Sequence, residues 1–178
     1  MMPSHQYGQP DRCPGSRTRI IERLHMQAIT VAIADDDGTR RARYEHFLQG
    51  AQGIRVLTDA NTSACDIGSI RELNPRVLLV SLKQCTDADY AMLDSLRREC
   101  PEMGVILLTD EALPHDDLIM QALAKGARGY LNLEAGSVHI SKAVHVIERG
   151  EAWVPRKMLK KVMDQILIGY QQDRAIPN

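Results

Sequence analysis

The sequence has few aromatic residues and few cysteines. Aromatic residues make up 4% of the 178 positions, with one Trp and one Phe, so the core has to be built from aliphatic side chains and Met. The four cysteines form no CxxC pair and show no spacing typical of a metal site; they are Cys13, Cys65, Cys85 and Cys100. This distribution favours free thiols in a reducing compartment over a disulfide framework.

A strong net charge and long apolar runs are also missing. The 22 basic and 23 acidic residues give a formal net charge of −1, which provides no global electrostatic basis for binding nucleic acid or a membrane. No apolar run approaches the roughly 20 residues that a membrane-spanning helix needs, and the N-terminus lacks the apolar core of a signal peptide. We therefore expect a cytoplasmic protein that is not bound to a membrane.

The chain divides into three parts by composition. Residues 1–27 are polar and rich in Pro, Gly, Arg and His, and we expect them to form a disordered extension. Residues 28–150 alternate between short apolar runs and segments with helical periodicity. Residues 151–178 contain Pro155, which suits the first turn of a helix, and apolar residues at helical spacing. They predict a sixth, amphipathic helix and a tail, which would serve as a linker and pack on the domain or on a partner.

Within residues 28–150 the sequence predicts five strands and five helices. The strands are expected at 29–34, 54–60, 76–80, 104–110 and 127–132. The helices are expected at 38–50, 63–74, 88–100, 116–126 and 137–150. This regular alternation with short links predicts an α/β fold, in which helices cover both faces of a parallel sheet.

In such a sheet, functional residues gather at the carboxyl ends of the strands. Asp35, Asp36 and Asp37 follow the first strand, and three adjacent carboxylates need a cation among them or must point apart into water. A pair of them suits a hard cation such as Mg²⁺, but one could equally cap the following helix. Spacing alone leaves both possibilities open. The third strand lies in RVLLVSLKQC, and we expect a polar loop after its end at Ser81.

Several common motifs do not occur at these strand ends. The chain contains no GxGxxG sequence, no Walker A sequence, no nucleophile elbow and no HExxH sequence. The sequence therefore gives no support to a Rossmann dinucleotide site, a P-loop, a serine hydrolase or a zinc protease.

Three short stretches resemble the receiver domains of bacterial two-component response regulators. They are IADDD at the first strand, LLTD at the fourth and GARGYL at the fifth. The pattern AKGARGYL, followed later by GEAWVPRK, resembles the NarL/FixJ branch in particular. The resemblance implies a flavodoxin-like (CheY-like) three-layer sandwich with strand order 2-1-3-4-5. It also implies transfer of a phosphoryl group from a histidine kinase to an aspartate beside a bound Mg²⁺.

Some working residues of the receiver family have counterparts in this chain. Asp35 and Asp36 match the acidic pair that holds Mg²⁺. Thr109 matches the hydroxyl that moves toward the phosphoryl group, and Tyr130 matches the aromatic switch on the fifth strand.

Four other positions depart from the family pattern. The phosphoacceptor aspartate falls on Ser81, and the lysine that neutralises the phosphoryl oxygens falls on Leu133. Asp110 stands where a small residue is usual, and Cys85 stands where a proline is usual. A serine hydroxyl without a base is a weak nucleophile, and Leu133 cannot stabilise the transferring charge. Asp110 would add negative charge near the pocket and repel phosphate.

These departures predict a pseudo-receiver that accepts no phosphoryl group and is not an enzyme. We expect no cofactor, except that Asp35 and Asp36 could still bind Mg²⁺ weakly. The expected mode of action is protein contact, either with a signalling protein or as a homodimer through the fourth helix, fifth strand and fifth helix. DNA would be bound only by a helix-turn-helix domain that is absent from this chain, so these residues would be the regulatory half of a transcription regulator.

Two alternatives remain open from the sequence. The first is a small Mg²⁺-dependent phosphatase or hydrolase of flavodoxin-like fold that uses Asp35 and Asp36, although the strand ends supply neither a base nor a cation. The second is phosphorylation of Ser81 by a Ser/Thr kinase, at a strand end beside acids where added negative charge is disfavoured.

Overall fold

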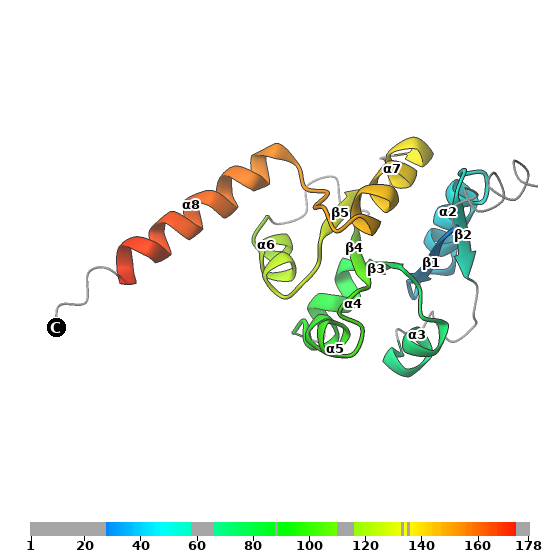
Figure 1. Ribbon diagram of the computed structural model, residues 1–178, viewed down its shortest axis with the longest axis horizontal. Helices are drawn as coiled ribbons and strands as arrows, with labels where there is room; N and C mark the ends of the chain where they lie inside the picture. Colours follow the sequence, from blue (N-terminus) through cyan, green and yellow to red (C-terminus); the bar gives the residue numbers. More distant parts are fainter. Residues whose placement is uncertain are drawn as a thin grey trace, which may run out of the picture.

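The fold is a parallel five-stranded sheet with helices on both faces (Figure 1). The computed structural model describes residues 28–57, 66–87, 89–109, 116–132, 134 and 136–173, with side chains up to Asp164. The strands pair in the order β2-β1-β3-β4-β5. They are β1 (Ile29–Ala34), β2 (Ile54–Leu57), β3 (Val77–Ser81), β4 (Gly104–Thr109) and β5 (Gly129–Asn132). The predicted strand order and the flavodoxin-like class are confirmed.

Seven helices are found in the described part of the chain. They are α2 (Gly38–Gln49), α3 (Ile67–Leu73), α4 (Leu82–Asp87), α5 (Ala91–Glu99), α6 (Asp116–Ala124), α7 (Gly136–Glu148) and α8 (Arg156–Asp173). Helices α2 and α7 share one apolar core with the sheet, and α3 to α6 share another with its opposite face. The three-layer sandwich is therefore confirmed.

The central strand β3 contributes to both cores. Leu78 and Val80 belong to the core on the α3–α6 side, whereas Val77 and Leu79 belong to the core on the α2–α7 side. Successive side chains of a strand point to opposite faces, so a strand covered on both sides needs apolar residues at every position. This requirement explains the continuous run Val77–Val80, all of which is buried.

The polar loop that we expected after β3 is wrong, because α4 begins directly at Leu82. Leu82 and Cys85 lie three residues apart and are both buried in the core, which gives this short helix an apolar side. The predicted helix over 88–100 also starts later, at Ala91, because Tyr90 has a left-handed backbone with φ of 59°. The Tyr90 ring is buried, and its hydroxyl donates a hydrogen bond to the Leu118 carbonyl at 3.1 Å.

The segment after α7 packs along the edge of the sheet. The backbone N–H of Trp153 donates a hydrogen bond to the Arg128 carbonyl at 3.0 Å. The Trp153 carbonyl accepts a hydrogen bond from the Tyr130 N–H at 3.1 Å. This pairing covers the backbone of β5, which would otherwise be an open edge strand. In Figure 1, α8 then extends away from the sheet. Among the described residues, no helix combines the length and apolar character that crossing a lipid bilayer requires.

The first turns of α8 are fixed to the domain by one buried side chain and by charge. Met158 is fully buried in the core shared with α6. Asp116 at the start of α6 faces two lysines of α8, with its carboxylate 3.5 Å from Lys157 Nζ and 2.7 Å from Lys161 Nζ. The hydrogen bond from Lys161 is the main cause that lowers the pKa of Asp116 below its ordinary value of 3.8.

We predict that Asp116→Asn loosens the start of α8. Because the folded pKa of Asp116 is lowered, its contribution to stability is present above the unfolded pKa and is lost as the pH falls through the folded pKa. At neutral pH the variant should mimic that acid state. Amide hydrogen exchange of residues 156–164 should become a few-fold faster, whereas exchange in β3 and β4 should not change. Asp117→Asn is the matched control, and equal exchange in both variants would contradict the proposed anchor.

Candidate functional site

The candidate site lies at the carboxyl ends of β1, β3 and β4. Asp35 directly follows β1, Ser81 ends β3 and Thr109 ends β4. Ala34 is in register with Val80, and Ser81 with Leu108, so these three polar residues end neighbouring strands. They are also the buried polar or charged residues of the described chain, with exposed fractions of 0%, 4% and 7%. The structure thus brings together three of the residues that the sequence analysis singled out.

The buried carboxylate of Asp35 is paired with Arg40 from the first turn of α2. The Arg40 Nε donates to one carboxylate oxygen at 2.9 Å, and Nη2 donates to the other at 2.7 Å. The backbone N–H of Asp37 donates to the second oxygen at 2.9 Å. A two-pronged pair between guanidinium and carboxylate is among the stronger hydrogen-bonded contacts in proteins. Asp35 is therefore shielded from solvent and held in place by three hydrogen bonds.

The other two acids have different surroundings. Asp37 is the N-cap of α2, and its side chain accepts hydrogen bonds from the backbone N–H groups of Thr39 and Arg40 at 2.9 Å and 3.1 Å. These two bonds lower the pKa of Asp37 below its ordinary value. Asp36 points outward, with 58% of its side chain exposed. Helix capping, one of the two possibilities that the spacing left open, is therefore the role of Asp37.

Gln84 ties α4 to the acidic loop. With its amide oriented to match its partners, its nitrogen donates to the Ala34 carbonyl at 3.1 Å and its oxygen accepts from the Asp36 N–H at 3.2 Å. One side chain of α4 therefore satisfies two backbone groups beside Asp35. This contact exists because α4 follows β3 without a loop.

Sequence reasoning missed both Arg40 and Gln84. The available signal for Arg40 was the need of three adjacent acids for a cation, combined with an arginine five residues after Asp35. No comparable signal pointed to Gln84, because its position depends on the helix that was expected to be a loop.

The arrangement around Asp35 does not fit a divalent metal ion. Mg²⁺ demands near-octahedral oxygen ligands at about 2.0–2.1 Å, and both oxygens of Asp35 already accept hydrogen bonds from Arg40. Ser81 adds no carboxylate. In the described part of the chain, no group of three or more His, Cys, Asp or Glu side chains is placed to hold a metal. The weak Mg²⁺ site expected at Asp35 and Asp36 stays a prediction, and this geometry weighs against it.

The remaining predicted site residues are placed as follows. Tyr130 lies on β5, is half-buried and packs against the core on the α3–α6 side. Cys85 is fully buried in the same core. Asp110 and Leu133 lie outside the described residues, so their roles stay predictions.

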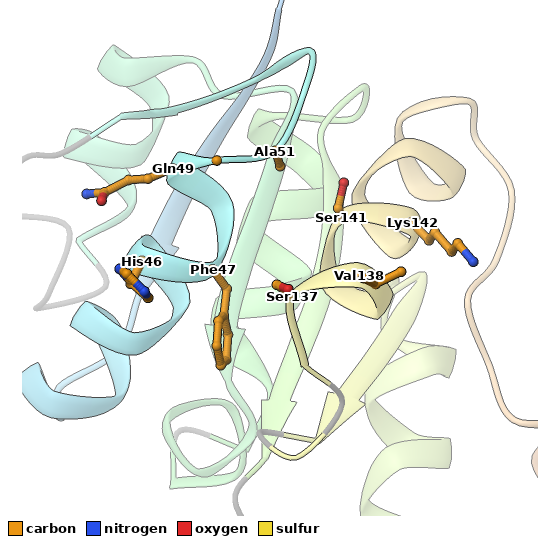
Figure 2. Close-up of a pocket in the computed structure, with 9 residues that line it drawn as sticks. His46, Phe47, Gln49, Ala51, Ser137, Val138, Ser141 and Lys142 are labelled. Carbon is orange, nitrogen blue, oxygen red and sulfur yellow. The ribbon is translucent and has the colours of Figure 1, made fainter.

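A groove lies between α2 and α7, on the other face of the sheet from α4 (Figure 2). This groove has a volume of about 840 Å³. Phe47 and neighbouring residues of α2 line one side, and Val138 and Lys142 are among the α7 residues on the other. Among the described residues that line the groove, none is an acid or a cysteine, so these residues offer contact surface rather than an acid–base pair.

We predict that Arg40→Ala destabilises the domain by about 3 kcal/mol, because removing one partner leaves a buried charge unpaired. Urea unfolding would measure this loss. Arg43→Ala is the matched control on the same helix, since Arg43 is exposed and only lies over the Phe47 ring at 5.5 Å. Adding Asp35→Ala to Arg40→Ala should recover part of the loss. Equal losses in the Arg40 and Arg43 variants would show that the pair contributes little.

Comparison with known proteins gives distant relatives. No model of a known protein family matches the chain. The chain is 22% identical over 146 residues to the oxygen regulatory protein NreC of Staphylococcus aureus, a match that covers 82% of this chain and 66% of NreC. The chain therefore spans just under two thirds of the length of such curated relatives.

Solved structures of similar fold include receiver domains. The isolated receiver domain of RcsB from Salmonella enterica serovar Typhimurium superposes with a TM-score of 0.64 at 18% identity, over 76% of this chain and 98% of that domain. A LuxR family DNA-binding response regulator from Silicibacter pomeroyi is 28% identical, with a TM-score of 0.56 over 72% of this chain and 98% of that chain. Fold and sequence together confirm the predicted resemblance: the chain is similar to response-regulator receiver domains of the NarL/FixJ type.

Proposed function

We propose that this receiver domain signals through protein contact, without phosphorylation of an aspartate. The observation that carries the proposal is the identity and burial of Ser81, which is 4% exposed at the end of β3. A serine needs a base to act as a nucleophile. Asp35, the acid that follows the neighbouring strand, is engaged by Arg40 through both of its carboxylate oxygens. Among the described residues, Asp35 is therefore engaged elsewhere and Asp36 faces solvent, so neither acid is placed to activate the Ser81 hydroxyl.

The same contacts speak against the alternative of a phosphatase or hydrolase. Such an enzyme would use Asp35 and Asp36 as a pair, but Asp35 is buried and paired while Asp36 faces solvent. Nothing in the described residues favours that function. We therefore propose a binding role rather than catalysis.

Treatment with acetyl phosphate and Mg²⁺ tests this proposal. We expect intact-protein mass spectrometry to detect no added phosphoryl group, under conditions that modify a receiver domain with an intact acceptor aspartate. Beryllofluoride should likewise leave the sedimentation of the protein unchanged. An added phosphoryl group that disappears in Ser81→Ala would contradict the proposal.

We further propose that the contact is a homodimer through α6, β5 and α7, the elements predicted as fourth helix, fifth strand and fifth helix. Helix α8 packs on α6 and so extends this face. It leaves two large apolar side chains exposed, Leu159 at 47% and Met163 at 60%. DNA binding would come from a helix-turn-helix domain outside this chain, in line with the relative described as a DNA-binding response regulator.

The dimer face is tested by charge substitution. Leu159→Glu combined with Met163→Glu should convert a dimer to a monomer in analytical ultracentrifugation, because a dimer contact would bury these apolar side chains. Gln49→Glu is the control, since Gln49 is exposed on α2, outside the proposed face, and lines the groove between α2 and α7. Loss of the dimer in Gln49→Glu alone would move the interface to that groove. A monomeric wild-type protein would contradict the dimer proposal.

A further inference from the structure

We propose that Arg40 is a built-in cation that occupies the acidic pocket in place of a divalent metal ion. The inference rests on the proposed function, because it explains how the pocket stays charge-balanced without Mg²⁺ or a phosphoryl group. It also makes a separate claim about metal binding, which can be tested independently of phosphorylation.

The first step is the saturation of Asp35. Its two oxygens accept three hydrogen bonds at 2.7–2.9 Å, two from the Arg40 guanidinium and one from the Asp37 N–H. The carboxylate is fully buried, whereas 18% of the Arg40 side chain is exposed. A metal ion that bound Asp35 directly would have to displace the guanidinium from a buried acid.

The same guanidinium also lies near the other two acids. Its Nη2 lies 3.5 Å from an oxygen of Asp36, and its Nη1 lies 3.9 Å from an oxygen of Asp37. Arg40 thus faces all three consecutive carboxylates at once. The neighbouring Arg41 adds a second positive charge, since its Nη1 donates to the Asp35 carbonyl oxygen at 3.1 Å. Two cations therefore lie beside the acid that a further cation would have to bind.

The next step concerns the location of Arg40 in its helix. Arg40 is the third residue of α2. The dipole of a helix disfavours positive charge in the first turn. This first turn contains no acidic residue of its own. The cost of placing an arginine there is offset by the acids that precede the helix. The position of Arg40 therefore indicates that it is a counter-ion for Asp35 rather than an ordinary surface charge.

The residue at the end of the third strand is uncharged, because it is Ser81. An aspartate in place of Ser81 would add a second buried acid next to Asp35 and would need further positive charge. A neutral serine adds no such need. Arg40 and Ser81 are therefore complementary features of a pocket that needs no metal ion.

Metal binding by Arg40→Gln tests the inference. The glutamine keeps a polar side chain but removes the charge, so Asp35 and Asp36 become available to a cation. Mn²⁺ titration followed by electron paramagnetic resonance, and thermal unfolding against Mg²⁺, give two readouts. We expect Arg40→Gln to bind Mn²⁺ about tenfold or more tightly than the wild type. Arg43→Gln should behave like the wild type, and Arg40→Lys, which keeps the charge, should gain little.

Each outcome of these measurements either supports or overturns the inference. Mn²⁺ binding by the wild type that equals that of Arg40→Gln, and that Asp35→Asn abolishes, would overturn the inference. Absence of any gain in folded Arg40→Gln would also overturn it. If Arg40→Gln does not fold alone, circular dichroism decides: recovery of the helical signal at millimolar Mg²⁺ supports the inference, and no recovery contradicts it. Failure of the proposed function would instead appear as a phosphoryl group on the wild-type protein.

Discussion

The buried carboxylate of Asp35 is the constraint on which the candidate site depends. A charge removed from water destabilises a folded protein unless hydrogen bonds and an opposite charge compensate it. Arg40 can reach Asp35 only if α2 starts where it does, and Asp37 fixes that start as its N-cap. Gln84 lies on α4, on the other side of the sheet, and its side chain bonds the Ala34 carbonyl and the Asp36 N–H, the backbone groups on either side of Asp35. One buried acid therefore fixes the position of a loop and the ends of two helices.

An arginine satisfies this constraint better than a lysine would. Its planar guanidinium presents two parallel N–H groups to Asp35 and still faces Asp36 and Asp37 with the same group. A lysine is a point charge that would pair with one oxygen at a time. An arginine side chain is also not deprotonated in proteins, and it cannot dissociate from the chain as a bound ion can.

The sequence predicted β3 and β4 well because each is a short run that is buried on both faces, as in Val77–Val80. It predicted Asp35, Ser81 and Thr109 as site residues because parallel strands end at one edge. It could not predict the partner of Asp35, because a contact over five residues depends on where the helix begins. It missed α4, because the apolar side formed by Leu82 and Cys85 becomes apparent only when the opposing core is known.

A pocket that carries its own cation responds to different signals from one that binds a metal. The guanidinium of Arg40 is tethered to the acids it pairs with, so its local concentration does not depend on the solution. Changes in the pocket must then come through the elements that hold it, which are α2 and α4. Helix α4 follows Ser81 directly and packs in the core that also holds Tyr130 and Met158, the buried anchor of α8. A partner that moves α8 or α6 would therefore act on the same packed core as the pocket, and the coupling between surface and site would run through packing rather than through an exchangeable ion.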